Sequence, residues 1–124
     1  MQIINTKSAP EAVGPYSQAV LAGNILFVSG QIPLNPQTQT LISGDIKEQT
    51  KQCLENVQAI VLEAGGDIEK IVKCCIFLQN MNDFAAVNEV YASFFGSHKP
   101  ARVCVEVSKL PKSAAVEIDA IAAI

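Results

Sequence analysis

The chain has 124 residues, of which 49% are hydrophobic and 17% are charged, and its formal net charge is −3. This composition excludes a disordered chain and is typical of a globular protein. A chain of this length is the usual size of one domain, so we expect a single domain over residues 1–124. The nine Lys and Arg residues are scattered along the chain. Nucleic-acid binding requires clustered cations, so the sequence disfavours a nucleic-acid partner.

The sequence also disfavours a membrane or a metal as partner. Charges interrupt every apolar stretch well before the ~18 residues that a membrane-spanning helix needs. The first ten residues, MQIINTKSAP, lack the basic and apolar segments of a signal peptide. His98 is the only histidine, and the four cysteines form no Cys-x-x-Cys pair. We therefore expect a cytoplasmic protein with reduced thiols and no structural zinc site.

In chain order, the first predicted elements are two short strands, 17–22 and 25–30. The turn Ala22-Gly23-Asn24 joins them, so they are expected to form a hairpin. Residues 32–45 are predicted to be a loop, because prolines and glycine interrupt them.

The clearest helix is predicted to follow Asp45, which is a suitable N-cap, and to stop at Gly65-Gly66. Apolar residues recur along this segment at intervals of three and four. The β-branched, almost entirely apolar segment 71–78 predicts a buried strand. Asn82 or Asp83 can cap a second helix, whose apolar stripe contains Phe84, Val87, Tyr91 and Phe94.

Two more strands, 101–107 and 114–124, are predicted on either side of the turn KLPKS. The complete order is two strands, helix, strand, helix and two strands. That order is typical of an α+β domain in which two helices pack on one face of a mostly antiparallel sheet.

The last two strands carry the candidate chemistry. Alternation places Arg102 and Cys104 on one face of the first strand, opposite its valines, and Glu117 and Asp119 on one face of the second. If the apolar faces of both strands meet the helices, these four side chains share the opposite face of the sheet. If the two strands form a hairpin, Cys104 lies opposite Glu117 and Arg102 opposite Asp119, about 5 Å apart. A guanidinium can bind a carboxylate through two hydrogen bonds, and a carboxylate can orient a water and accept its proton. Alternation alone favours a plainer interpretation, an ion pair on a solvated sheet face.

Three blocks of sequence resemble the RidA (YjgF-type) family of reactive intermediate deaminases. They are GPYSQAV at 14–20, VSGQIP at 28–33 and PARVCVEVSKLPKSAAVEIDAIA at 100–122. The resemblance extends through NVQAIVLEAGG and NEVYASFF to essentially the whole chain. It implies a chorismate-mutase-like α+β subunit that forms a homotrimer, with three clefts at the subunit interfaces.

The resemblance also implies roles for individual residues. By it, Arg102 holds the substrate carboxylate and Glu117 positions or activates the hydrolytic water. Cys104 lines the pocket near the substrate nitrogen, and the wall is completed by Tyr16, Ser29 and Gly30. The implied substrates are 2-imino and 2-enamino acids such as 2-aminoacrylate, 2-iminopropionate and 2-iminobutyrate. The implied products are 2-keto acids and ammonia, and no cofactor is needed.

Two other functions stay open at this point. The same cleft in the same trimer can bind or sense a 2-keto acid without catalysis. An endoribonuclease or translation-inhibitor activity, attributed to some relatives, is the weaker alternative because the chain is acidic and has no basic stripe. A nucleophilic role for Cys104 is also disfavoured, since no histidine base can be identified near it.

Overall fold

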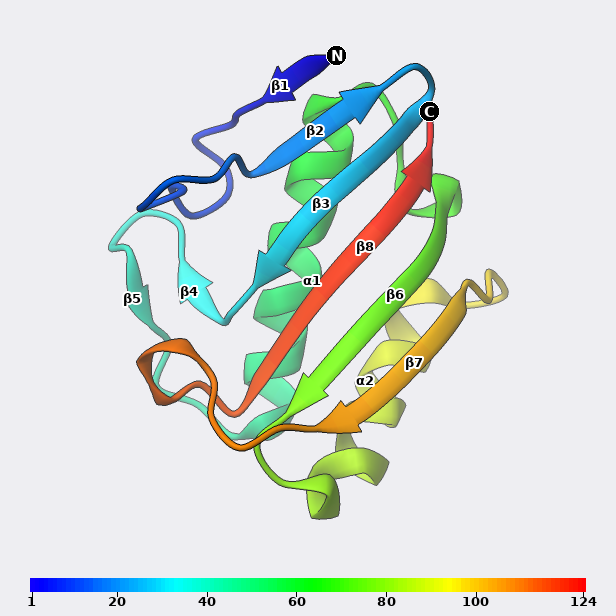
Figure 1. The fold of residues 1–124 in the computed structure, drawn as a ribbon. Coiled ribbons are helices and arrows are strands. Elements are labelled where there is room, and N and C mark those ends of the chain that lie inside the picture. Colours follow the sequence, from blue (N-terminus) through cyan, green and yellow to red (C-terminus); the bar gives the residue numbers. More distant parts are fainter.

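The computed structural model describes all 124 residues. It has two layers, a six-stranded sheet and a pair of helices that cover one face of that sheet (Figure 1). The order of the strands across the sheet is β1-β2-β3-β8-β6-β7. Their bounds are β1 Gln2–Ile4, β2 Ala19–Ala22, β3 Ile25–Gln31, β6 Ile71–Leu78, β7 Ala101–Glu106 and β8 Val116–Ala123. The predicted α+β domain with both helices on one face is confirmed.

The sheet is mixed, because one pair of strands is parallel. Strands β6 and β7 run in the same direction, and all other neighbouring pairs are antiparallel. Helix α2 (Phe84–Phe95) connects β6 to β7. Parallel strands need such a crossover connection. As a result β6 lies between β7 and β8, so the predicted hairpin of the last two strands is wrong.

Helix α1 (Ile46–Glu63) begins and ends where its sequence predicts. Asp45 is the N-cap, and its carboxylate accepts a hydrogen bond of 2.9 Å from the backbone N–H of Glu48. The chain leaves the helix through Gly65, whose φ of 92° favours glycine. Neither helix is long and apolar enough to cross a membrane.

Short elements occupy the connections. Residues 32–45, predicted to be a loop, contain a small hairpin of β4 (Leu34–Asn35) and β5 (Thr40–Leu41). Three 3-10 turns span Ile68–Lys70, Met81–Asp83 and Pro111–Ser113.

The core lies between the helices and the sheet. Strand β8 is central, and its residues Val116, Ile118, Ala120 and Ala122 are all buried. The alternate residues of β8, which include Glu117 and Asp119, therefore lie on the open face of the sheet, away from the helices. This part of the sequence prediction is confirmed.

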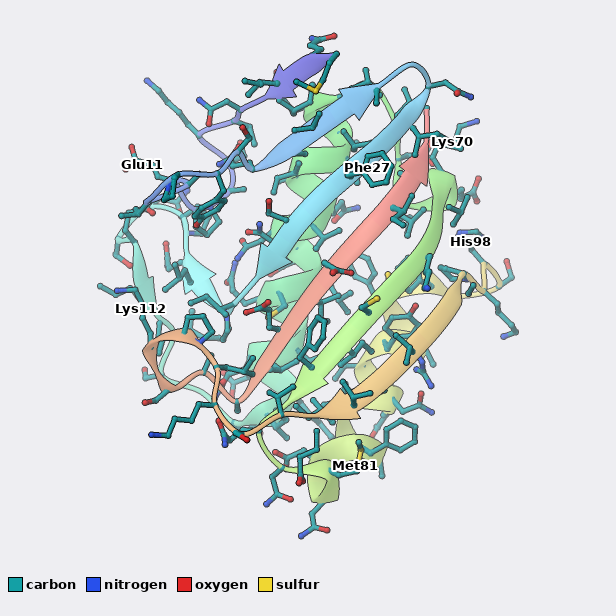
Figure 2. All side chains as sticks on the ribbon, viewed as in Figure 1. Glu11, Phe27, Lys70, Met81, His98 and Lys112 are labelled. Carbon is teal, nitrogen blue, oxygen red and sulfur yellow. The ribbon has the colours of Figure 1, made fainter.

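The open face of the sheet carries exposed apolar side chains. Phe27, on β3, lies in front of the sheet when the helices lie behind it (Figure 2), and it is 49% exposed. On β7, Val103 and Val105 are 42% and 39% exposed. The expectation that the valines of this strand face the helices is therefore wrong.

Candidate active site

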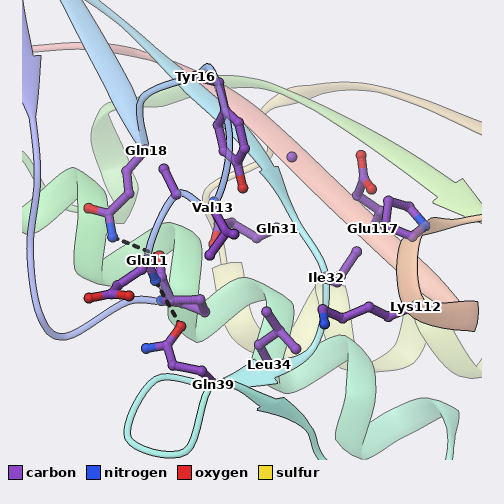
Figure 3. Close-up of a pocket in the computed structure, with 14 residues that line it drawn as sticks. Glu11, Val13, Tyr16, Gln18, Gln31, Ile32, Leu34, Gln39, Lys112 and Glu117 are labelled. Atoms are coloured by element: carbon purple, nitrogen blue, oxygen red, sulfur yellow. Dashed lines mark hydrogen bonds between the residues drawn. The ribbon is translucent and has the colours of Figure 1, made fainter.

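A hollow beside Glu117 has a volume of about 410 Å³. Its lining comes from the loop before β2, from the end of β3 and from the turn before β8, and it includes Tyr16, Gly30 and Glu117 (Figure 3). A volume of this size is typical of small-molecule sites. The hydroxyl of Tyr16 and the carboxyl of Glu117 both point toward this space.

Gly30 lets the Glu117 carboxyl approach the backbone of β3. The pairing of β3 with β8 shifts register between Val28 and Gln31, so Ser29 and Gly30 lie in a bulge. A Cβ at residue 30 would overlap Oε2 of Glu117 and lie 2.9 Å from its Cδ. Bulges of this kind often lie beside active sites, where they redirect the chain. Only glycine at residue 30 leaves room for the Glu117 carboxyl in its observed position.

For the hydrolysis of 2-iminobutyrate that the resemblance implies, we expect Gly30→Ala to lower kcat/KM by about 10–100-fold, because the new methyl group displaces the Glu117 carboxyl by about 1 Å. Steady-state kinetics measures this effect. Gly44→Ala is a matched control, since a Cβ there would lie 2.9 Å from the Cβ of Glu48, outside the hollow. Wild-type kinetics in Gly30→Ala would contradict a role for this contact.

The surroundings of Glu117 favour its neutral form. Burial raises the pKa of the Glu117 carboxyl, and the nearby charge of Asp119 raises it further. Asp119 is itself held, because its Oδ1 accepts a hydrogen bond of 3.2 Å from the backbone N–H of Cys75. A carboxylate whose pKa is raised is a better proton acceptor than an ordinary glutamate.

Hydrogen bonds from buried polar side chains hold the wall that carries Tyr16. The Gln18 side chain is buried; its Oε1 accepts from the N–H of Thr6 at 2.7 Å, and its Nε2 donates to the carbonyl of Pro10 at 2.8 Å. The Ser29 hydroxyl donates to the carbonyl of Ser17 at 2.6 Å. Ser29 therefore ties β3 to the Tyr16 loop and does not itself line the hollow. The sequence analysis gave no role to Gln18, although its position inside the GPYSQAV block was a signal.

Arg102 lies on the other face of the sheet. In the parallel pairing of β7 with β6, Arg102 is opposite Cys74, which is buried beneath the helices. Its Nη1 donates to Oδ1 of Asn88 at 2.6 Å. Its guanidinium carbon lies 4.9 Å from the ring centroid of Tyr91 and 5.6 Å from that of Phe84.

These three partners of Arg102 are spaced along α2 so that they share one side of the helix. The aromatic rings attract the guanidinium, and the amide oxygen fixes its orientation. The guanidinium is thus held in place while it stays accessible, next to a second hollow of about 420 Å³ whose lining includes Arg102, Asn88 and Lys99.

Cys104 is half-buried on the same side of β7 as Arg102. Burial raises the pKa of its thiol, and the positive charge of Arg102 offsets this only in part. The thiol is therefore protonated at neutral pH, which argues against a thiolate nucleophile.

The prediction that Arg102 and Glu117 share one neighbourhood of the same chain is wrong. Strand β6 separates them, and the two side chains lie on opposite faces of the sheet. Each chain thus carries two half-sites: an acid half-site with Tyr16, Gly30 and Glu117, and a guanidinium half-site with Arg102 and Cys104. No group of three or more His, Cys, Asp or Glu side chains is arranged to hold a metal ion.

Comparison with known proteins places the chain in a family. A family model described as "Endoribonuclease L-PSP" matches residues 6–124. A RutC family protein of Pyrococcus horikoshii is 54% identical over 121 residues, which cover 98% of this chain and 96% of that protein. An Escherichia coli protein named "Putative reactive intermediate deaminase TdcF" is 48% identical over 124 residues, with coverage of 98% and 95%.

Solved structures agree with the sequence matches. The structure of E. coli TdcF with bound serine has a TM-score of 0.96 and 46% identity, and the match covers 100% of this chain and 99% of that one. RidA from an Antarctic Psychrobacter has a TM-score of 0.96 and 44% identity, and both chains are covered completely. The chain therefore belongs to the RidA/YjgF family, which the family model describes as endoribonuclease L-PSP, and the resemblance stated above is confirmed.

Proposed function

We propose that the protein hydrolyses 2-imino and 2-enamino acids to 2-keto acids and ammonia, at sites completed between copies of the chain in a homotrimer. The proposed substrates are small: 2-iminopropionate, its enamine 2-aminoacrylate, and 2-iminobutyrate. One observation carries the proposal: the Glu117 carboxyl, with its raised pKa, lies against Gly30 in a hollow of substrate size. The four free cysteines suit a reducing compartment such as the cytoplasm.

The reaction needs only a modest rate acceleration from the protein, because an imine carbon is already electrophilic. Glu117 orients a water and takes its proton while the oxygen attacks the C=N carbon. Glu117 gives this proton to the imine nitrogen, which completes the carbinolamine. It then takes the hydroxyl proton of the carbinolamine and passes it to the amine nitrogen, so that ammonia leaves as the C=O bond forms. Arg102 binds the substrate carboxylate with two parallel hydrogen bonds and so positions the carbon. The serine bound to E. coli TdcF resembles these substrates, because its nitrogen is also attached to the carbon next to the carboxylate.

Arg102 and Glu117 can both touch one small substrate only if they come from different chains. Within one chain they lie on opposite faces of the sheet. Each chain carries both half-sites, so a head-to-tail interface joins the acid half-site of one copy to the guanidinium half-site of the next. Head-to-tail contacts form a ring when the rotation between neighbouring copies closes, and three copies related by 120° close in this way. The exposed Phe27, Val103 and Val105 supply apolar surface for such an interface.

Mixing two inactive variants tests this arrangement. We expect Arg102→Ala and Glu117→Gln each to be inactive alone, and to recover activity when they are unfolded together and refolded at equal amounts. A site needs one subunit that keeps Glu117 and a neighbour that keeps Arg102, each with a chance of about one half, so about a quarter of the sites are intact. The deamination rate of 2-iminobutyrate measures the recovery, and each variant refolded alone is the control. Mixed oligomers, verified by native mass spectrometry, that stay inactive would contradict the shared site.

Two alternatives are distinguished by direct measurements. A non-catalytic 2-keto-acid sensor would bind the ligand through Arg102 but would not accelerate hydrolysis. Endoribonuclease activity is worth testing because the family model carries that description. RNA binding normally needs several cations, however, and Lys112 is the only Lys or Arg residue that lines the Glu117 hollow. RNA binding that weakens steeply with salt, together with RNA cleavage lost in Lys112→Ala, would support that activity.

A further inference from the structure

Strained backbone is concentrated around the Glu117 hollow. The chain has three non-glycine residues with left-handed backbone: Gln39 with φ of 59°, Lys112 with φ of 56° and Ser113 with φ of 58°. Gln39 and Lys112 line the hollow, and Ser113 follows directly. Such conformations cost energy in residues other than glycine, and they cluster at functional sites.

The side chain of the strained Gln39 connects two of the segments that line the hollow. It lies at the end of the β4–β5 hairpin, a position where glycine would fit the backbone more easily. Its Oε1 accepts a hydrogen bond of 3.0 Å from the N–H of Glu11, and its Nε2 donates to the carbonyl of Pro36 at 2.7 Å. The hairpin is thereby fastened to the loop that carries Tyr16.

The strained Lys112 brings a positive charge to the end of the hollow away from Glu117. In the view of Figure 3 its ammonium lies on the side of the hollow that carries Leu34, and the Tyr16 hydroxyl and the Glu117 carboxyl lie on the opposite side. Lys112 has no carboxylate partner, because the one ion pair in the chain joins Lys47 to Glu89. The carboxylate of Glu11, which also lines the hollow, points away from this ammonium.

The hollow is larger than the smallest proposed substrates need. At roughly 30 Å³ per non-hydrogen atom, the share of a water molecule in the liquid, 2-iminobutyrate fills about half of the 410 Å³ that one chain provides. The hollow is also lined by the apolar side chains of Val13, Ile32 and Leu34. Methylene groups can pack against these side chains, and an anion beyond them can meet Lys112.

We propose that the Lys112 end of the hollow is a subsite for substrate side chains that end in a carboxylate, so that dicarboxylic 2-imino acids are preferred substrates. This inference rests on the proposed deaminase function and specifies its substrate class. Lys112 acts on specificity: its ammonium binds the distal carboxylate, while the reacting carbon stays at Glu117.

The test compares two stable product analogues, 2-oxoglutarate and 2-oxopentanoate, which share a chain length but differ in the distal carboxylate. Calorimetry gives the dissociation constant of each, and inhibition of 2-iminobutyrate hydrolysis gives a second value. We expect the wild type to bind 2-oxoglutarate about five- to tenfold more tightly, and this preference to shrink as salt is added. Lys112→Gly should abolish the preference, and Lys112→Glu should reverse it.

Two features keep the test sharp. Glycine suits the left-handed backbone at residue 112, so Lys112→Gly is expected to fold at least as stably as the wild type. Lys109→Glu is the matched control, because it changes an exposed lysine of the same connection that does not line the hollow, and it should keep the wild-type preference.

Two outcomes would overturn the subsite. One is equal affinity of the wild type for both keto acids. The other is an equal loss of affinity for both in Lys112→Gly, which would mean that Lys112 binds the carboxylate that both ligands share. Failure of the wild type to hydrolyse any imine would instead remove the deaminase function, and the two dissociation constants would still decide the subsite.

Discussion

Glu117→Gln is expected to lower kcat/KM for 2-iminobutyrate by about 10²–10⁴-fold, the usual contribution of a general base. Glutamine keeps the size of the side chain beside Gly30 but cannot accept a proton from water. The variant should still bind 2-oxobutyrate within about threefold of the wild type, because the substrate carboxylate is held elsewhere. Kinetics and calorimetry on the same preparations give both values. Retained turnover in Glu117→Gln would show that Glu117 is not the general base.

The pH dependence of the wild type follows from the direction of the Glu117 shift. Its pKa is raised in the folded protein, so the carboxylate is lost at a higher pH than in an ordinary glutamate, and kcat/KM should fall there on acidification. A raised carboxyl pKa favours folding below the unfolded-state pKa, and this contribution is lost as pH rises through the folded-state pKa. Glu117→Gln is therefore not expected to destabilise the fold at neutral pH. Asp119→Asn removes the nearby negative charge and should move the acid limb to lower pH.

Arg102→Ala is expected to lower kcat/KM by about 10²–10³-fold and to abolish measurable binding of 2-oxobutyrate. Loss of a charge pair with two hydrogen bonds costs about 2–5 kcal/mol, most of which appears as weaker binding. Calorimetry with 2-oxobutyrate measures this loss directly.

Arg102→Lys separates charge from geometry. Lysine keeps the charge but cannot form two parallel hydrogen bonds or stack on the Tyr91 ring in the same way, so recovery should be only partial. Lys51→Ala is the control, because Lys51 is exposed on α1 and lines neither hollow. Unchanged affinity for 2-oxobutyrate in Arg102→Ala would show that another group binds the carboxylate.

Most of the fold could be predicted because local signals and packing agree. The spacing of apolar residues between Asp45 and Gly65 defines α1, and the apolar run 71–78 coincides with β6. The alternation in β8 also placed Glu117 correctly on the open face, since Val116 and Ile118 are buried on the other.

The position of β7 could not be predicted, because two rules conflict there. Its valines form the apolar face, and such a face normally turns toward the core, but here Val103 and Val105 are exposed. Arg102 turns toward the helices, where Tyr91 and Asn88 hold its guanidinium. Strand pairing added a second difficulty, since the short turn KLPKS favoured a hairpin whereas the crossover through α2 pairs β7 with β6.

The candidate site was only partly accessible from the sequence. The contact of Gly30 with Glu117 depends on a shift of register between β3 and β8, which no local pattern encodes. Asn88 carried a usable signal, because a polar residue near the apolar side of α2 needs a partner, and that partner is Arg102. The left-handed backbone of Lys112 has no signal in its residue type, since glycine or asparagine is the usual choice.

The placement of Arg102 and Glu117 on opposite faces of the sheet affects how defective alleles behave in a cell that also has a normal one. In the proposed ring each subunit serves one site with its acid and the neighbouring site with its guanidinium. A copy that loses only one of the two groups would silence one site, but a copy that loses both groups and still assembles would silence two. A cell that expresses such a doubly defective allele beside a normal one would lose more activity than the share of defective chains, and the allele would behave as partly dominant.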